Sequence, residues 1–328
     1  MSRVAASNMT KKILALAGGV GGARLANGLA QILPPDAFTI VVNTGDDFEH
    51  LGLSVSPDLD TVMYTLAGIN NPAQGWGVAG ESWGFMDMVK RLGGESWFAL
   101  GDHDTAVHAL RTLRLRCETL SSITADFCER LGVRHGVAPM SDNSVRTMID
   151  TDEGRLAFQD YFVRRQCAPR FRGIAFDGIE QARPSARFLE ALADPALSAI
   201  IICPSNPILS IRPITSLPGI TEQLRHRRVP VIAISPFIGG EAVKGPAAKI
   251  MRELDLPTTP EGLITYYDGL IDALVIDHQD AKFAERKSPV RTLVTDILIR
   301  DRADQARLAR EVITFAQTLP APSQDAAG

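Results

Sequence analysis

The chain has 328 residues, of which 45% are hydrophobic and 22% are charged, as is typical of a globular protein. This length accommodates one large α/β domain with an elaboration, or two domains. The formal net charge is −4, so the totals indicate no basic surface and exclude nucleic acid as an expected partner. Anionic ligands are still allowed, because a glycine-rich turn at a helix N-terminus binds them through backbone N–H groups.

The cysteines and the two ends of the chain indicate a cytoplasmic protein. The four cysteines are scattered, without a C-x-x-C pair or a His/Cys cluster, which predicts reduced thiols and no zinc site. Residues 1–10 lack the apolar core of a signal peptide, and no stretch approaches the roughly 20 apolar residues of a membrane span. We expect disorder in residues 1–10 and in the tail, 320–328.

The first elements predict a βαβ unit. An apolar run at residues 11–17 predicts a buried parallel strand that ends at glycines. Helical spacing follows over 23–33, where Leu25, Leu29 and Ile32 share one face. Residues 38–42 form a second apolar, β-branched run, so the order is strand, glycine turn, helix and strand.

Helices are expected next over residues 58–66 and 82–92, then a short strand over 97–100 and helices over 104–113 and 120–131. From 133 to 195 the pattern changes, and a hairpin at 145–150 and 156–163, a strand at 172–176 and a helix at 185–193 indicate an inserted smaller α+β segment, or cap. Strands at 199–203, 229–234 and 273–276 then alternate with helices at 220–227, 247–254 and 301–319. The chain therefore predicts a Rossmann-like, doubly wound, mostly parallel α/β sheet, with its nucleotide-binding core in 11–132 and 196–319.

The segment GGVGG at residues 18–22 stands where a nucleotide-binding turn belongs. Glycines let the backbone approach a phosphate and turn sharply into a helix. The G-x-G-x-x-G pattern fails only at Arg24, and no Gly-Lys-Ser/Thr of a Walker A loop follows. A tight turn without a ligand is the alternative, and phosphate binding is the favoured interpretation.

Two acidic segments indicate a magnesium site. Asp46 and Asp47 follow the second strand, where side chains at the carboxyl ends of parallel strands point into a ligand crevice. Asp58 and Asp60 open the next expected helix behind Ser56 and Pro57. Magnesium prefers carboxylate oxygens beside phosphates, although a solvated turn would explain the first pair, and helix capping explains Asp58 fully. Asp60 is left without a capping role.

Further polar segments lie at other expected strand ends. LGDHD at residues 100–104 precedes His108 and Arg111, and Asp104 and His108 share a helix face. Ser205 and Asn206 follow the strand at 199–203, where they can bond a phosphate or a base, and Lys244 is a candidate phosphate contact. Polar segments at five expected strand ends indicate a crevice for a large phosphorylated ligand.

These segments resemble the 2-phospho-L-lactate transferase family of coenzyme F-420 biosynthesis. The resemblance covers about residues 11–320, and its eight segments occur in the family's order. They are GGVGG (18–22), VNTGDD (42–47), SPDLDTV (56–62), LGDHD (100–104), PMSD (139–142), FQD (158–160), PSNP (204–207) and SP (235–236).

The resemblance implies a transferase that requires Mg²⁺ and binds two partners. One is the deazaflavin Fo (7,8-didemethyl-8-hydroxy-5-deazariboflavin); the other is a guanylylated donor, the guanosine diphosphate ester of a three-carbon phospho-acid. The terminal ribityl hydroxyl of Fo attacks the phosphorus that bears the small acid, and GMP leaves. Phospholactate, phosphoenolpyruvate and phosphoglycerate all stay open as the transferred group, and so does the oligomeric state, with a homodimer as the common default.

The resulting assignments combine the residues with the resemblance. Asp46 and Asp60 are expected to bind the metal and to act in catalysis, with Asp60 orienting or deprotonating the hydroxyl, and Asp47 and Asp58 assist at the metal. The remaining site residues are expected to bind the diphosphate, the nucleotide and the deazaflavin. They are Gly18, Gly19, Gly21, Gly22 and Asn43, then Ser205, Asn206 and Lys244, and, for the ring, Trp97, Ala99, Asp102 and His103. At Ala99 the chain departs from the longer polar side chain expected there.

Two rival functions fit these segments less well. A related family of non-enzymatic regulators binds nucleotide-sugars with a similar glycine segment, but it usually lacks the SPDLDTV and LGD segments that are present here. A nicotinamide-dependent oxidoreductase is disfavoured by Arg24 at the third glycine position and by the acidic strand end. The transferase is therefore the preferred hypothesis.

Overall fold

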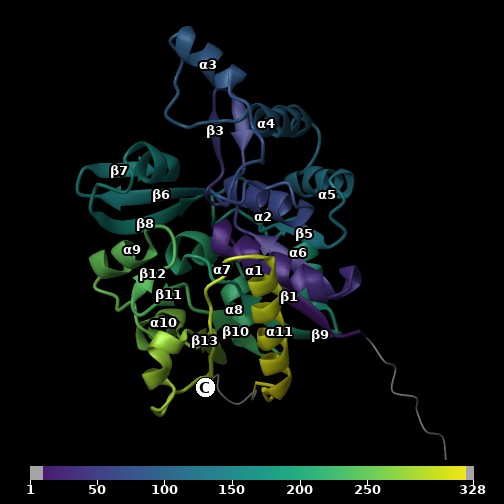
Figure 1. Cartoon of the computed structure of the whole chain (residues 1–328), viewed down its shortest axis with the longest axis vertical. Helices are drawn as coiled ribbons and strands as arrows, with labels where there is room; N and C mark the ends of the chain where they lie inside the picture. Colours follow the sequence, from purple (N-terminus) through teal and green to yellow (C-terminus); the bar gives the residue numbers. More distant parts are fainter. Residues whose placement is uncertain (1–9, 323–328) are drawn as a thin grey trace, which may run out of the picture.

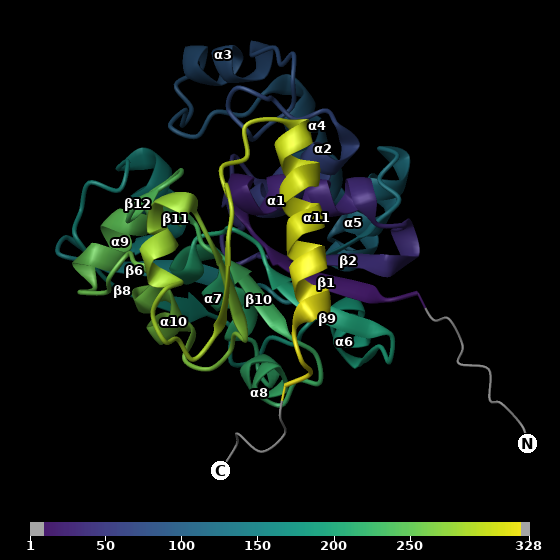
Figure 2. The same ribbon diagram turned by 60° about the horizontal axis from the view of Figure 1, so that its bottom comes forward.

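The computed structural model describes residues 10–322. Its centre is a seven-stranded sheet, in the order β14-β13-β10-β9-β1-β2-β5, in which all neighbouring pairs are parallel. Figure 2 looks onto this sheet through helices α1 and α11. The strands are β1 (Lys12–Ala17), β2 (Phe38–Val42), β5 (Gly136–Pro139), β9 (Leu197–Ile202), β10 (Val231–Ile234), β13 (Ala273–Ile276) and β14 (Arg291–Val294).

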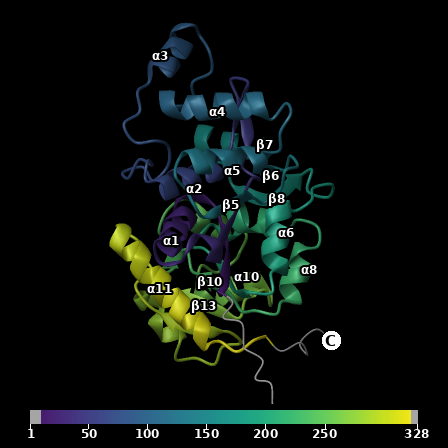
Figure 3. The same ribbon diagram turned by 90° about the vertical axis from the view of Figure 1, so that its right-hand side faces the viewer.

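Helices cover both faces of the sheet. In Figure 3, α1 (Gly19–Ile32) and α11 (Arg302–Thr318) lie on one side, and α6 (Ala186–Ala193) and α8 (Ile220–Arg225) lie on the other. The alternation of side chains along β1 explains this layering, because Leu14 and Leu16 enter one hydrophobic core and Ile13 and Ala15 enter the other. The predicted doubly wound α/β fold is confirmed.

Helices α2 (Pro57–Ala67) and α5 (Leu120–Arg130) complete the layer that contains α1. A smaller lobe projects beyond them, at the top of Figure 1. It contains α3 (Gly84–Arg91), α4 (Asp102–Arg114) and the hairpin of β3 (Phe48–His50) and β4 (Leu53–Val55). Val55, Met86 and Leu100 form its small apolar core.

The predicted strand over residues 97–100 is wrong. The segment has no strand partner and joins α3 to α4. Its apolar side chains pack inside the projecting lobe instead. The ring centroids of Phe98 and Phe48 are 4.8 Å apart, and Leu100 is fully buried. The LGDHD segment therefore does not follow a strand of the central sheet.

The segment predicted as an insertion contains a second, antiparallel sheet, in the order β7-β6-β8. Its strands are β6 (Arg146–Thr151), β7 (Gly154–Ala157) and β8 (Phe171–Asp177), which confirms the hairpin, although a π-helix, η2 (Asp160–Arg164), replaces the end of its second strand. The structure also differs at the start of the segment, because β5 pairs with β2 in the central sheet. The division of the chain into a core and an insertion stays a prediction.

The remaining short elements lie in the second half of the chain. They are η3 (Pro207–Ile211), α7 (Arg212–Thr215), β11 (Phe237–Ile238), β12 (Glu241–Ala242), α9 (Ala247–Glu253), α10 (Pro260–Tyr267) and η4 (His278–Phe283), with η1 (Pro35–Ala37) earlier. Within residues 10–322, no helix combines the length and apolar character needed to cross a membrane. Most of the predicted terminal disorder falls outside the described residues.

The strand order fixes where a ligand crevice forms. From β1 the chain proceeds to β2 on one side, whereas β9 leads to β10 on the other side. In open parallel sheets, ligands bind outside the carboxyl ends of the strands where the winding reverses in this way. That point, between β1 and β9, brings residues 18–22 beside residues 204–206.

Candidate functional site

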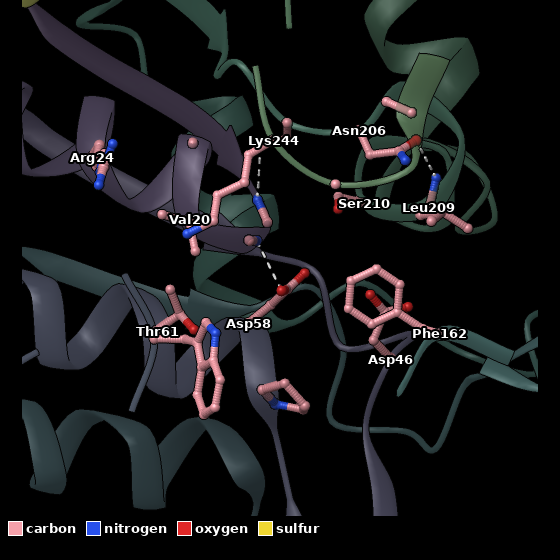
Figure 4. A pocket seen from close by; sticks show the side chains of 18 of the residues that line it. Val20, Arg24, Asp46, Asp58, Thr61, Phe162, Asn206, Leu209, Ser210 and Lys244 are labelled. Carbon is pink, nitrogen blue, oxygen red and sulfur yellow. Dashed lines mark hydrogen bonds between the residues drawn. The ribbon is translucent and has the colours of Figure 1, made fainter. Parts of the chain in front are cut away.

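A cavity of about 820 Å³ opens at this point, a volume within the range of cofactor and substrate sites. Figure 4 shows side chains from α1, the end of β2, α2 and the segments after β9 and β10 around it. Most of the residues predicted for the site line the cavity. These are Gly18, Gly19, Gly21, Asp46, Asp58, Asp60, Trp97, Ala99, Ser205, Asn206 and Lys244.

The glycines lie at the start of a helix rather than in a loop, since α1 begins at Gly19. A Cβ on Gly21 would stand 2.2 Å from the carbonyl oxygen of Pro204, and one on Gly18 would stand 2.5 Å from Oδ2 of Asp58. Gly22 is similarly close to Ser205 and lies outside the cavity lining. The first reason for these glycines is thus the close approach of α1 to β9 and to α2.

Protein groups already engage the first amides of this helix. The N–H of Gly18 donates to Oγ of Ser205 at 3.1 Å, and the N–H of Gly19 donates to Oδ1 of Asp58 at 2.8 Å. Val20 and Gly21 follow at the cavity surface. The positive end of the α1 dipole therefore faces the cavity beside a carboxylate.

Four buried carboxylates form the acidic wall of the site; three of them line the cavity, and the fourth, Asp47, does not. Asp46, Asp47, Asp58 and Asp60 are each less than 9% exposed. Burial and the charge of Asp58 raise the pKa of Asp46 well above its usual value. Burial raises the pKa of Asp47 to about 7 and that of Asp58 to about 6, against hydrogen bonds from Ser56 and Asn43.

This wall fits a divalent cation. Oδ1 of Asp46 and Oδ1 of Asp47 are buried without a hydrogen-bond partner in the part of the chain that the structure describes. Buried charges are normally paired or bound to a metal, and carboxylate oxygens are the ligands of Mg²⁺. A cation here would offset both the burial and the repulsion from Asp58 that raise the pKa of Asp46.

Asp60 is set apart from the other three acids by its partners on α4. Nη1 of Arg111 donates to its Oδ2 at 3.0 Å, and Nη2 of Arg111 donates to its Oδ1. Nδ1 of His108 lies 3.6 Å from Oδ2 of Asp60, and Nε2 of His108 lies 3.3 Å from Oδ1 of Asp104. The hydroxyl of Tyr64 donates to that same oxygen of Asp104 at 2.7 Å.

Asp60, Asp104 and His108 also each bring one potential metal-ligand atom within 4.8 Å of the other two. The guanidinium of Arg111 touches two members of this group, Asp60 and His108. A divalent cation there would meet its positive charge at close range. The three residues together are therefore better satisfied as a network of ion pairs and hydrogen bonds than by a shared cation, which leaves for another ligand only the lone pairs of Asp60 that Arg111 does not engage.

Other predicted residues lie outside the cavity lining. Asn43 is fully buried behind Asp58, to whose Oδ2 its Nδ2 donates at 3.0 Å, and Asp47 accepts a 2.7 Å hydrogen bond from the Ser56 hydroxyl. Asp102 accepts from the N–H groups of Gly84 and Phe85 at the start of α3. The hydrogen bonds of Asp102, above all that from Ser82, lower its pKa.

His103, the last of these, is largely exposed, and its backbone N–H donates to Glu81 at 2.8 Å. Asp102 and His103 thus serve the chain around α3 and α4. The family resemblance predicts that they contact the deazaflavin ring, and the expected strand over residues 97–100 predicts that they lie at a sheet edge. Without that strand, they do not stand at a sheet edge.

Sequence reasoning missed an aromatic part of the wall. Phe98, Phe162 and Trp76 line the cavity together with Trp97. Phe162 stacks on Phe158, with ring centroids 5.3 Å apart and planes at 14°, and remains 37% exposed. Phe162 comes from η2, a segment whose apolar residues indicated a strand, so no periodicity marked it as part of the site.

It also missed Arg24 as a cavity residue. Nη1 of Arg24 donates to the carbonyl of Ile299 at 2.8 Å, and Nζ of Lys244 donates to the carbonyl of Gln74. Within residues 10–322 neither cation forms an ion pair with a carboxylate, and both burial and the charge of Arg24 lower the pKa of Lys244. Figure 4 shows the two side chains on the α1 side of the cavity. Neighbouring cations without counter-ions are suited to an anionic ligand.

Comparison with known proteins gives consistent results. Residues 13–314 match the family described as 2-phospho-L-lactate transferase CofD. A 2-phospho-L-lactate transferase of Methanopyrus kandleri is 39% identical, over 95% of this chain and 99% of its own. A phosphoenolpyruvate transferase of Streptomyces coelicolor is 37% identical, over 93% and 98%.

One solved structure, a UPF0052-family protein from Bacillus halodurans, superposes with a TM-score of 0.61 at 14% identity. The alignment covers 93% of this chain and all of that one. At this identity the likeness concerns the fold alone. It supports the seven-stranded architecture independently of the sequence matches.

Proposed function

The chain belongs to the 2-phospho-L-lactate transferase family and is a transferase, and from this premise we propose the reaction and the roles of its residues. The transferred group is a three-carbon phospho-acid, the donor is its guanosine diphosphate ester, and the acceptor is the ribityl hydroxyl of the deazaflavin Fo. The hydroxyl oxygen forms a bond to the phosphorus that bears the small acid. The bond from that phosphorus to the bridging oxygen breaks, and GMP leaves with the bridging oxygen.

The observation that carries this proposal is the pairing of opposite charges across one cavity. In the described part of the chain, Arg24 and Lys244 form no ion pair with a carboxylate, and Asp46 and Asp58 form none with a cationic side chain. A diphosphate is drawn to the first pair but repelled by the second. A divalent cation between the acids and the diphosphate satisfies both, as phosphoryl transfer requires.

We assign the metal to Asp46 and Asp60, with Asp47 and Asp58 adding negative charge nearby. When bound, Mg²⁺ would stabilise the charge that develops on the departing phosphate oxygen. The support for this assignment is the unpartnered Oδ1 of Asp46 and the position of Asp60 at the cavity surface. Asp60 orients the acceptor hydroxyl through the oxygen lone pairs that Arg111 leaves free.

The rest of the cavity binds the two organic partners. Lys244 and Arg24 hold phosphate groups, and the donor's nucleotide lies along Ser205 and Asn206, whose side chains follow β9. The deazaflavin ring packs near Trp97 and Ala99, with the exposed face of Phe162 as a further contact. Asp102 and His103 are left out of this assignment, because they lie outside the cavity lining.

The names of the relatives point to more than one three-carbon acid as the transferred group. One is named for 2-phospho-L-lactate and another for phosphoenolpyruvate. These acids differ in a single unsaturation, and a hydrophobic pocket discriminates poorly between such analogues. The proposal therefore covers the class of three-carbon phospho-acids.

Isothermal titration with Fo and with GDP tests the proposal. We expect both to bind, GDP more tightly in the presence of Mg²⁺, and neither UDP-sugars nor NAD to compete. Binding of a UDP-sugar without any binding of Fo would contradict the proposal and support the regulator hypothesis. Competition by NAD would support the oxidoreductase hypothesis.

A further inference from the structure

Two helices face each other with matched rows of polar residues, which are buried except for the half-buried Asp104. Asp60 and Tyr64 are four residues apart on α2, and Asp104, His108 and Arg111 are spaced by four and three residues on α4. Such spacings place side chains on one face of a helix. The two rows therefore meet as one surface, although the helices are far apart in sequence.

The contact between the rows is strongest at Asp60. Arg111 is 2% exposed and Asp60 is 4% exposed, and the guanidinium donates to both oxygens of the carboxylate. A two-point grip of this kind fixes the plane of the carboxylate as well as its position. Arg111 itself does not line the cavity, whereas Asp60 does.

Three further side chains form a second layer around this pair, and they line the cavity themselves. Nη1 of Arg111 lies 3.3 Å from Nδ1 of His108, whose other nitrogen faces Asp104 at 3.3 Å. Tyr64 of α2, which is 1% exposed, donates a hydrogen bond to Asp104 and so links α4 to α2 a second time. Because Asp60 and Arg111 are both buried, a rotation of the Asp60 carboxylate is costly, since it would leave Arg111 unpaired.

We propose that Arg111, supported by His108, Asp104 and Tyr64, is a positioning residue that sets the orientation in which Asp60 meets the metal and the acceptor hydroxyl. This inference rests on the proposed function for the identity of those two groups. Its own content is that Arg111 acts on the site although it does not line the cavity itself. A partner that orients a metal ligand typically affects metal affinity or activity by about 10- to 100-fold when it is replaced.

Arg111→Lys tests the proposal, because lysine keeps the charge and removes the second donor. The matched control is Arg114→Lys, one turn further along α4. Arg114 pairs with Glu118 and Asp126 at the surface, where ion pairs contribute little. Each full-length variant is titrated with Mg²⁺ alone by calorimetry and is then assayed for kcat and KM.

For Arg111→Lys we expect the dissociation constant for Mg²⁺ to rise about 10-fold or more and kcat to fall about 10- to 100-fold. KM for both substrates should stay within about threefold, since no substrate contact is lost. Arg114→Lys should match the wild type in every quantity. A merely structural Arg111 would lower the melting temperature and leave the Mg²⁺ affinity of the folded chain unchanged.

A folded Arg111→Lys chain with Mg²⁺ affinity and kcat equal to those of Arg114→Lys overturns the proposal. If Arg111→Lys does not fold, Asp104→Asn replaces it, since this change loosens the second layer and keeps both Arg111 and Asp60. An unchanged Mg²⁺ affinity and kcat in that variant would overturn the proposal equally. Wild-type protein that binds Mg²⁺ but releases no GMP contradicts the proposed function alone, and the Mg²⁺ titration still decides the role of Arg111.

Discussion

Asp47 allows a direct test of how strongly burial disfavours negative charge in the acidic wall. Its carboxylate is 8% exposed, one of its oxygens has no hydrogen-bond partner in the described chain, and burial raises its pKa to about 7. In the unfolded chain it titrates near 3.8. Between these two values the folded protein holds a proton that the unfolded protein has released, so folding stability falls as pH rises.

The size of the effect follows from that window. Each pKa unit corresponds to about 1.4 kcal/mol, and the interval from pH 5 to pH 7 spans about two units. Asp47→Asn removes this titration. The free energy of unfolding of the variant, relative to wild type, should therefore rise by about 3 kcal/mol between pH 5 and pH 8. Any loss from an unpaired amide is the same at both pH values and cancels.

The assay is urea unfolding followed by circular dichroism, with both proteins at pH 5 and at pH 8. Saturating Mg²⁺ at pH 8 should shrink the advantage of the variant, because a cation stabilises the Asp47 charge. A difference between the two proteins that does not change with pH would refute the reasoning. It would mean that Asp47 ionises freely in the folded chain.

Four further changes test other parts of the site. Gly21→Ala should lower the melting temperature, because its Cβ would stand 2.2 Å from the Pro204 oxygen. Overpacking costs about 1–3 kcal/mol, which exceeds the roughly 1 kcal/mol that alanine gains over glycine in a helix. An unchanged melting temperature would contradict this close approach. Lys244→Met should raise KM for the donor about 10-fold and spare that for Fo, and an equal rise for both would refute a donor-specific contact. Phe162→Ala should raise KM for Fo by a similar factor, whereas unchanged Fo binding would remove it from the ring site. Asp60→Asn should keep the fold and lose about one to three orders of magnitude in kcat, and a near-native rate would defeat its assignment.

The sheet could be predicted from the sequence because its strands are buried on both faces. Residues 12–17 and 197–202 are almost continuous apolar runs, the first followed by glycines and the second by Cys203 and Pro204. Segments with helical spacing lie between such runs. β14 was missed, since Arg291–Val294 is short and only partly buried at this edge of the sheet. The strand expected at 97–100 is absent because a short apolar run can also be buried without strand pairing. Here the run packs in the apolar core of the projecting lobe.

The site was predictable to the extent that it lies at strand ends. Asp46, Ser205 and the glycines follow β2, β9 and β1 directly, so their convergence follows from the parallel order. What could not be predicted is whether a given aspartate faces a ligand or instead binds another part of the chain. Asp102, the first residue of α4, accepts hydrogen bonds from the start of α3, and Asp60 is paired with Arg111 of α4. Both facts depend on how α3 and α4 pack against the rest of the chain.

The measurement that tests the central claim most directly is mass spectrometry of the products of a single incubation. Purified protein, Fo and Mg²⁺ are mixed separately with the guanosine diphosphate esters of phospholactate, phosphoenolpyruvate and phosphoglycerate. We expect one or more mixtures to release GMP and to convert Fo into a phosphodiester heavier by the phospho-acid residue of that donor, in equal amounts. Unmodified Fo and intact donor in all three mixtures, from folded protein that binds Mg²⁺, would contradict the account.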